Sequence, residues 1–547
     1  MSVVKLYIIL YCSTFLLICG CKNNKHVKSN EYNYYSNKNY TDLKLDSSTI
    51  ETFLKSALIT DSVRNEVKEF YSKRGYQFAW FNNDGMVDAT TVFYNQLKNY
   101  TADFKDTTFN KIEIDSLLSL VQIDEKSFLS NIKIVNQLEL LLTVTFFQYA
   151  HKVYGGTTSS LRDLEWYIPR KKKDYKMLLD SLVLASNGET IQEPVNVFYT
   201  QLKDKLKQYR QIQKGGGLPT IFFKNKFLKQ GDTASCIKAI KQNLFLTGDL
   251  LINNKSIDFD DSLESSVKRF QKRMGLLVTG KIDQLSITEM NKSIDFRIQQ
   301  IMVNMERLRW MPVNMENNYL LINIPEYKLH VYENGTTNWS MNVVVGKGAT
   351  QTNIFKGNIS EVVLNPYWNV PTSIVNNDVL PHLKRNVSYI SKNKMEIRSG
   401  ITVVNPYSVN WHKYKNAIPY TVRQKPGKNN SLGKIKFLFP NSFNIYLHDT
   451  PSKVLFGETK RAFSHGCIRI EEPLKLAYYI TKDNTDWNNN RIDSVLTTDK
   501  ETSISIQHRM PVYIVYFTAW VSSDGQMNFR NDIYNLDDKL RKEIFNE

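Results

Sequence analysis

The chain of 547 residues contains only five cysteines, and this scarcity limits what cysteine can do in it. Cys12 and Cys19 fall in an apolar N-terminal segment that we expect to be removed, and Cys21 ends that segment. Cys236 and Cys467 then remain as the thiols of the mature protein. An exported protein could join them in a disulfide. We expect none, because Cys236 lies in an amphipathic helical pattern, where a free cysteine packs as a small apolar side chain.

The sequence also offers no apolar run at its N-terminus that is long enough to span a membrane. The run from Leu6 to Ile18 is too short, because a spanning helix needs about 20 apolar residues. Together with Lys5 it fits a secretory signal. The closing tetrapeptide, 18–21, resembles a lipobox, in which the last cysteine is diacylated. This predicts a signal peptide at 1–21, a membrane anchor at Cys21 and a polar tether at 22–45. An ordinary signal peptide that is cut nearby is the alternative.

A basic stripe interleaved with aromatic residues is absent as well. The formal net charge is +17, but the basic residues are dispersed along the chain. We therefore expect no nucleic-acid partner. The charge favours solubility, or attraction to an anionic surface such as a cell wall or phospholipid.

The length and composition predict a protein of several domains. Hydrophobic residues make up 42% of the chain, which is typical of globular proteins. Since one core rarely exceeds about 250–300 residues, we expect about three domains. Helical periodicity predicts a scaffold over 46–220 and a compact three-helix unit over 221–292. From 293 to 525 the pattern changes to strands, with an insertion at about 374–430, and an apolar stripe predicts a C-terminal helix over 526–547. The fold class is therefore α+β and multidomain.

The segment Ser464-His465-Gly466-Cys467-Ile468-Arg469 is the strongest candidate for chemistry, and His448 precedes its cysteine by nineteen residues. A cysteine beside glycine, between a histidine and an arginine, is in an environment that favours a thiolate nucleophile. Apolar residues alternate on both sides of a turn at 440–442. This pattern predicts a hairpin with one buried face, from whose other face Tyr446 and His448 project together.

The combined pattern resembles the signature of the L,D-transpeptidases, cysteine enzymes that cross-link bacterial peptidoglycan. Blocks at 304–310, 365–371 and 424–427 resemble the large, multidomain Gram-negative members. The resemblance implies a mostly antiparallel β-sandwich catalytic domain whose insertion is a lid over the active site. Residues 221–292 resemble a peptidoglycan-binding module, although the turn at 281–283 is less glycine-rich than usual. A spacer bundle that no longer binds glycan is the alternative.

The resemblance also implies a reaction. Cys467 would attack the carbonyl of the third residue of a tetrapeptide stem and release the terminal D-Ala. The side-chain amine of a neighbouring stem would then displace the cysteine, giving a 3–3 cross-link. A free thiol has a pKa of about 8.5, so His448 must take its proton or stabilise the ion pair. The backbone carbonyl of Asp449 is implied to orient the imidazole, with the Asp449 carboxylate as the other option.

Further residues around the motif have expected roles. The backbone N–H groups of Gly466 and Cys467 are candidates to stabilise the oxyanion, with the Tyr446 hydroxyl as a third donor. Ser464 and His465 are expected to shape and orient the turn.

The side chains that would bind substrate are less defined by sequence. Arg469 could hold a substrate carboxylate, or form an ion pair with Glu471 or Glu472. Trp368 and Tyr367 could line the donor groove or pack in a core.

Metal and cofactor chemistry are not expected. His448, His465 and Cys467 could each ligate zinc, but no fourth ligand stands near them in sequence. A pair at 352–353, Thr-Asn, stands where the family usually has Thr-Pro, and we expect this to affect a loop and not the chemistry.

The anchor and the binding module together imply a periplasmic enzyme of a Gram-negative bacterium. It would be tethered by Cys21 to a membrane and would act on the stem peptides and glycan of peptidoglycan. Since carbapenems acylate the cysteine of this family, Cys467 is predicted to form such an adduct. A carboxypeptidase that uses water as acceptor, and a wall-binding lipoprotein without activity, are the alternatives.

Overall fold

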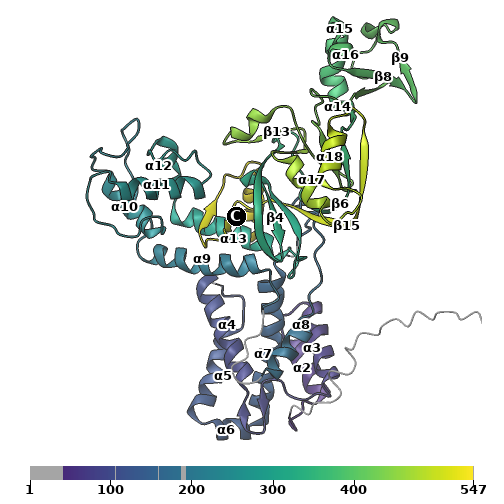
Figure 1. The fold of residues 1–547 in the computed structure, drawn as a ribbon. Helices are drawn as coiled ribbons and strands as arrows, with labels where there is room; N and C mark the ends of the chain where they lie inside the picture. Colours follow the sequence, from purple (N-terminus) through teal and green to yellow (C-terminus); the bar gives the residue numbers. More distant parts are fainter. Residues whose placement is uncertain (1–40, 105, 158, 186–192, 546–547) are drawn as a thin grey trace, which may run out of the picture. The chain divides into compact units, whose positions relative to one another are not determined.

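The computed structural model describes residues 41–104, 106–157, 159–185 and 193–545 (Figure 1). The predicted signal peptide, Cys21 and most of the tether lie outside these residues. The chain divides into two compact units, of which the first takes in 1–98, 107–148 and 176–189, and the second the remainder. Residues of the predicted scaffold, 46–220, are found in both. No helix of the described ranges is both long and apolar enough to cross a membrane.

The first unit is mainly helical, as predicted. Its elements are α2 (Ser47–Ser56), α3 (Asp61–Lys73), the strands β1 (Phe81–Asn82) and β2 (Gly85–Met86), α4 (Asp88–Phe104), α5 (Lys111–Ile123), α6 (Glu125–Ser130), α7 (Ile132–Tyr149) and α8 (Tyr175–Leu184), of which α4, α7 and α8 cross the limits of the unit. Helix α7 is buried along its centre, which confirms the expected core helix. The carboxyl group of Glu139 lies within this core and accepts hydrogen bonds from the Tyr71 hydroxyl at 2.7 Å and from the N–H of Trp80 at 2.9 Å.

The helices of the second unit include the three of the predicted compact module. These are α10 (Ile237–Leu246), α11 (Asp261–Arg273) and α12 (Gln284–Met290), and they lie between the longer helices α9 (Val197–Lys214) and α13 (Ile294–Arg309). The expectation that strands begin at 293 was wrong, because α13 occupies the first sixteen residues. Its Ile294, Ile298, Ile301 and Leu308 are buried at helical spacing, but buried polar residues between them hide the pattern.

The catalytic-domain region is one sheet that closes on itself. Its strands are β3 (Tyr319–Asn323), β4 (Lys328–Glu333), β5 (Thr336–Gly346), β6 (Phe355–Leu364), β11 (Ile435–Leu438), β12 (Leu447–His448), β13 (Ala462–Ser464), β14 (Ile468–Ile470) and β15 (Thr502–Val515). They are hydrogen-bonded in the order β13-β5-β14-β12-β11-β6-β15-β3-β4, and β4 pairs with β5 again. Most pairings are antiparallel, as predicted, but the closing pair joins the expected sandwich into a single ring of strands.

Elements after the motif complete this unit. Helix α17 (Pro473–Thr481) begins at the proline, as expected for the first turn of a helix, and α18 (Asn489–Leu496) follows. Strands β16 (Ala519–Val521) and β17 (Met527–Phe529) form a hairpin. The predicted C-terminal helix is therefore shorter than 526–547: it is α19 (Leu536–Phe545), and its Leu536 and Leu540 are buried.

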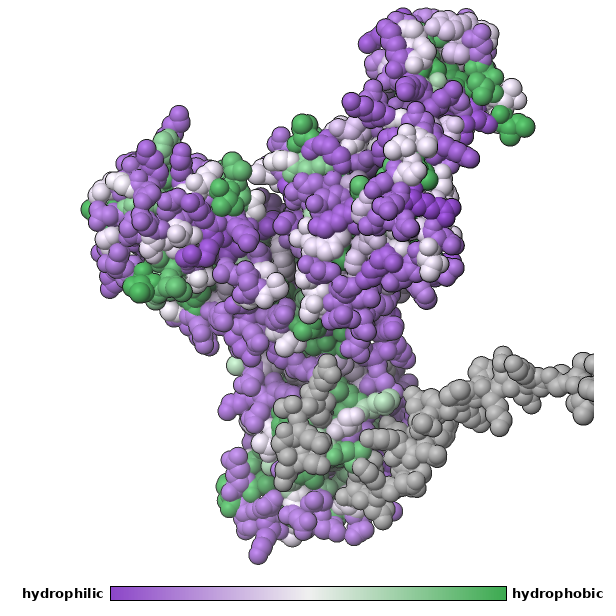
Figure 2. Space-filling model, in the orientation of Figure 1, coloured by the Kyte–Doolittle hydropathy of each residue, from purple (hydrophilic) through white to green (hydrophobic). Residues whose placement is uncertain are grey.

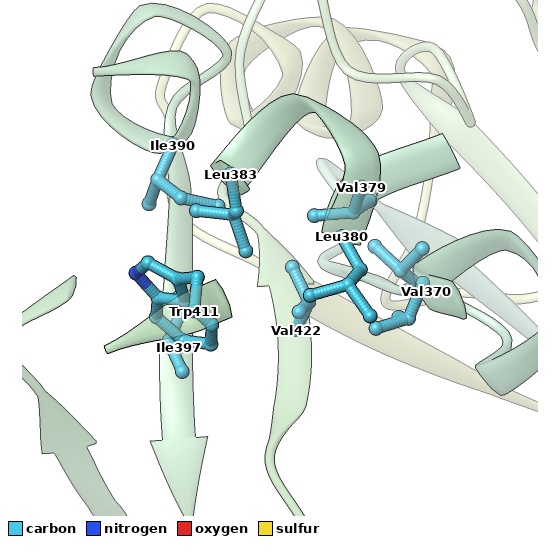
Figure 3. Close-up of a cluster of buried hydrophobic side chains, with 9 residues drawn as sticks. Val370, Val379, Leu380, Leu383, Ile390, Ile397, Trp411 and Val422 are labelled. Atoms are coloured by element: carbon cyan, nitrogen blue, oxygen red, sulfur yellow. The ribbon is translucent and has the colours of Figure 1, made fainter. Parts of the chain in front are cut away.

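The insertion has a core of its own (Figure 3). Strands β7 (Trp368–Asn369), β8 (Met395–Ser399), β9 (Thr402–Val404) and β10 (Thr421–Gln424) form a four-stranded sheet, and α14 (Thr372–Ile374), α15 (Leu380–Arg385) and α16 (Tyr389–Lys392) accompany it. Leu380, Leu383, Trp411 and Val422 are among the side chains buried together. Ile401, in the turn between β8 and β9, is exposed, and an apolar patch is visible at this end of the insertion (Figure 2). The insertion is thus a small folded subdomain, and its role as a lid stays a prediction.

Candidate active site

The hairpin that carries His448 is confirmed. In the β11–β12 pair, Phe437 lies opposite Leu447 and Lys436 opposite His448. Phe437 and Leu447 are fully buried on the core side. Alternation along the strand therefore brings Tyr446 and His448 to the other face, where their rings lie 5.6 Å apart.

A parallel pairing brings the cysteine to this face. Strand β14 runs parallel to β12, with Ile468 beside Leu447 and Arg469 beside His448. The N–H of Ile468 donates to the carbonyl of Tyr446 at 3.2 Å, so Cys467 enters the strand next to Tyr446. Its thiol donates to the carbonyl of Asn444, with 3.7 Å between sulfur and oxygen. Two separate segments thus form one site through strands of only two and three residues.

The turn before the cysteine depends on glycine and serine. Gly466 has a φ of +112°, which favours glycine over any residue with a side chain. The Ser464 hydroxyl accepts the Gly466 N–H at 3.2 Å and donates to the Cys467 carbonyl at 2.5 Å. The Gly466 N–H is therefore already hydrogen-bonded. It is not free to stabilise an oxyanion, and the sequence-based expectation that it would be such a donor is wrong. The N–H of Cys467 has no partner in the described part of the chain, and His465 is exposed.

A second loop braces the same turn, and sequence analysis missed it. The Thr352 hydroxyl donates to the Gly466 carbonyl at 2.8 Å and accepts the Gly346 N–H at 2.9 Å. The Thr350 hydroxyl donates to the Ser464 carbonyl at 3.0 Å. The Thr-Asn pair at 352–353, which we expected to affect only a loop, therefore contacts the backbone that presents the candidate nucleophile. Only the three-dimensional fold brings these threonines, more than a hundred residues away in sequence, to the turn.

Burial favours the neutral form of both the His448 imidazole and the Cys467 thiol. His448 is almost completely buried, and its Nδ1 lies 2.5 Å from the Asp449 carbonyl oxygen. Since a carbonyl only accepts, Nδ1 carries the proton and Nε2 is left as an acceptor. Burial lowers the pKa of His448 to about 3, against the effect of the Asp449 carbonyl, and the charges of Arg469 and Lys436 lower it further. Burial also raises the pKa of the Cys467 thiol.

Two cations face the candidate nucleophile. Lys436 Nζ lies 4.0 Å from the centre of the Tyr446 ring, and burial lowers the pKa of this lysine. The charges of Lys436 and Arg469 both act on the Cys467 thiol and partly offset the effect of its burial on the pKa. Lys436 is a site residue that sequence analysis missed, although its place opposite His448 in the predicted hairpin was a usable signal.

Arg469 makes no ion pair within the described ranges, and its Nε is buried without a hydrogen-bond partner. The ion pair with Glu471 or Glu472 is therefore not formed: Glu471 instead accepts the N–H of Asn342 at 3.1 Å, and Glu472 pairs with Lys475.

Of the two aromatic candidates, one reaches the site. The Trp368 side chain lies close enough to the Tyr446 hydroxyl to lower its pKa in part, although burial raises that pKa well above the ordinary value. Trp368 also packs against the core of the insertion. Tyr367 instead stacks under the Arg423 guanidinium, 3.9 Å from the ring centre. Among the described residues, no group of three or more His, Cys, Asp or Glu side chains could hold a metal ion.

Comparison with known proteins identifies the domains. A sequence model of the L,D-transpeptidase catalytic domain matches residues 317–514. The chain contains an L,D-transpeptidase domain. A model of a "Putative peptidoglycan binding domain" matches residues 237–290, the three helices of the compact module, and a model of a "Scaffold domain" matches 65–206.

One curated relative and two solved structures are similar to parts of this chain. A "Putative L,D-transpeptidase" of Haemophilus influenzae is 37% identical over 243 residues, 44% of this chain and 49% of the relative. The match thus spans about half of that relative. An L,D-transpeptidase from Stackebrandtia nassauensis is 12% identical, with 54% of this chain and 96% of that chain covered and a TM-score of 0.22. The catalytic domain of an E. faecium L,D-transpeptidase is 13% identical, with 37% and 99% covered and a TM-score of 0.19. Scores this low add nothing to the structural argument.

Proposed function

We propose that this protein is a peptidoglycan L,D-transpeptidase with Cys467 as nucleophile and His448 as base. One observation carries the proposal: the parallel β12–β14 pair brings the cysteine to the same face of the sheet as a buried imidazole whose Nδ1 is fixed by a backbone carbonyl. The match of this region to the transpeptidase catalytic domain supports the choice of reaction.

The proposed reaction starts from a neutral imidazole and a neutral thiol. His448 Nε2 takes the thiol proton while Cys467 Sγ bonds to the carbonyl carbon of the third stem residue. The oxyanion accepts a hydrogen bond from the free Cys467 N–H, and one such donor is worth about 3–4 kcal/mol in other enzymes. The protonated His448 then gives its proton to the leaving nitrogen, and D-Ala departs. In the second half the side-chain amine of another stem attacks the thioester, loses its proton to His448, and the thiol is restored with a 3–3 cross-link.

Arg469 and Lys436 supply the positive charge that an anionic stem requires. A buried guanidinium nitrogen without a partner is costly unless a ligand satisfies it. A substrate carboxylate would accept from Arg469 and be attracted by Lys436, which orients the stem for attack.

The test uses purified disaccharide-tetrapeptide with the protein lacking residues 1–21, beside Cys467→Ala. Mass spectrometry should show a cross-linked dimer that has lost one D-Ala, and the variant should form none. Formation of the tripeptide alone would indicate a carboxypeptidase. Intact substrate with the wild type would contradict the proposal.

We also propose that the protein is anchored in a membrane of the Gram-negative periplasm by a lipid on Cys21. The tetrapeptide at 18–21 and the polar segment after it support this. Expression with a labelled fatty acid should give labelled protein, and Cys21→Ser should abolish the label. An unlabelled wild type that is cut at another position would refute the anchor.

A further inference from the structure

A wide groove in the described structure lies away from Cys467 and His448, neither of which lines it. It has a volume of about 1560 Å³ and three walls, all within the second unit. One wall is the peptidoglycan-binding-like module, through the end of α11 and the start of α12. The second is formed by β3, β4, β5 and residues 457–463, and the third by the β16–β17 hairpin.

Hydrogen bonds fix the hairpin wall to the module and to α13. The Arg530 guanidinium donates to the Arg273 carbonyl at 2.7 Å, and the Gln300 amide donates to the Arg530 carbonyl at 2.9 Å. Gly275 allows this approach, because a Cβ there would lie 2.5 Å from Arg530 Nε. The groove is therefore bounded by packed elements and is preformed in this unit.

The lining is cationic and partly apolar. Seven lysine or arginine side chains line it against four acidic ones. Two of the acids are already paired: Glu289 with Arg297 at 2.8 Å, and Glu326 with His330 at 2.9 Å. Lys272, Lys328 and Lys460 form no ion pair in the described ranges. The groove thus has positive charge available for an external anion.

Exposed apolar side chains accompany this charge. Leu277, Val278 and Leu285 are 66%, 50% and 65% exposed, and all three belong to the wall formed by the module. A ligand for such a surface carries carboxylates together with apolar groups. A glycan strand with N-acetyl and lactyl methyl groups and with carboxylates on its stem peptides has this chemistry.

The groove also reaches the strand that leads to the motif. Ala462 and Phe463 of β13 line it, and Ser464, the next residue, shapes the turn before Cys467. A polymer held in the groove would therefore lie along the strand that leads to the candidate nucleophile.

We propose that this groove binds a segment of peptidoglycan glycan strand with its anionic stem peptides, as a second site separate from that around Cys467. The choice of polymer rests on the proposed function. The binding surface is then shared between the module and the transpeptidase domain, instead of belonging to the module alone.

The test measures binding of Cys467→Ala protein to purified insoluble peptidoglycan. The groove variant carries Lys272→Glu, Lys328→Glu and Lys460→Glu. The control variant carries Lys238→Glu, Lys392→Glu and Lys500→Glu, the same change of charge at residues outside the groove. A third variant, Leu277→Ser with Leu285→Ser, removes apolar surface without changing charge.

We expect the groove variant to bind roughly tenfold more weakly than the control, a loss of about 1.4 kcal/mol for the three reversed charges together. The leucine variant should weaken binding too. With Cys467 restored, turnover of soluble disaccharide-tetrapeptide should be unchanged in both, because that substrate is too small to need the groove. Equal binding by groove and control variants would overturn the inference. Groove-dependent binding by a protein that turns over no tetrapeptide would uphold it and contradict the proposed function instead.

Discussion

Replacing Thr352 by valine should disturb the turn at Ser464–Gly466 that presents Cys467, without changing Cys467 itself. Valine keeps the shape of threonine but removes the hydroxyl that bonds the Gly466 carbonyl at 2.8 Å and the Gly346 N–H at 2.9 Å. Both glycines are buried, so water does not replace the lost partner. An unsatisfied buried polar group costs about 1–3 kcal/mol, so the two together cost about 2–6 kcal/mol.

Part of this cost should appear in the rate of acylation, because the Gly466 carbonyl belongs to the turn that presents Cys467. If about 1.4 kcal/mol is lost from positioning, acylation slows roughly tenfold. The assay is the rate of mass increase with a carbapenem, measured beside the midpoint of thermal unfolding. Thr352→Ser, which keeps the hydroxyl, should acylate at nearly the wild-type rate.

A second control separates the turn from its support. The Tyr534 hydroxyl donates to the Gly346 carbonyl at 2.5 Å and accepts the Thr352 N–H at 3.3 Å, but it forms no hydrogen bond with Gly466. Tyr534→Phe should therefore lower the unfolding midpoint more than it lowers the acylation rate. If Thr352→Val acylates as fast as Thr352→Ser, the hydroxyl does not position the turn and the reasoning is refuted.

Four further predictions concern charge and burial. Cys467 should gain the mass of one carbapenem and Cys467→Ala none; an unmodified wild type would count against the nucleophile. Burial lowers the pKa of His448 to about 3 and raises the pKa of the Cys467 thiol, so both groups are neutral at rest. Alkylation of Cys467 by iodoacetamide should therefore keep accelerating as the pH passes 9.0. A plateau in the alkylation rate near neutral pH would contradict this. Lys436→Met should raise KM for the tetrapeptide roughly tenfold, because the variant loses one charge contact with the substrate carboxylate. An unchanged KM would exclude a carboxylate site at Lys436. Burial raises the pKa of Glu139 from 4.5 to about 7, so its protonated form stabilises the fold by about 3 kcal/mol below pH 4.5, and this contribution is lost as the pH rises through 7. Glu139→Gln should therefore flatten the dependence of the unfolding midpoint on pH. An equally steep dependence in the variant would exclude Glu139 as its source.

The sequence predicted those parts of the site that rest on one continuous pattern. The hairpin with His448 was readable because apolar residues alternate over both strands. The pairing of β12 with β14 was not, since β14 has only three residues and is not joined to β12 by a turn. Thr352 was missed for a related reason: its contact with Gly466 depends on the closure of the sheet, which no local pattern records.

The same limit explains the errors in the fold. Helix α13 was missed because Arg297, Asn304 and Glu306 are buried on faces that a helical pattern would leave to solvent. Some of their partners come from distant segments, as with Asn304 and the Thr518 hydroxyl at 2.7 Å. The insertion was recognised by its punctuation, but its small core could not be separated from loop residues by composition.

In the proposed mechanism, the main role of Lys436 and Arg469 is to bind an anionic substrate and not to stabilise the Cys467 thiolate. Lys436 and Arg469 lower the pKa of the thiol and also lower the pKa of His448. Proton transfer within the pair depends on the difference between these two values, and a charge that shifts both in the same direction leaves that difference nearly unchanged. The cations therefore do not drive formation of an ion pair, whereas burial opposes it at both residues. In the proposed mechanism the thiol loses its proton only as it attacks, when the negative charge moves to the carbonyl oxygen, and the positive charge of Lys436 and Arg469 is left to hold the carboxylate of the stem.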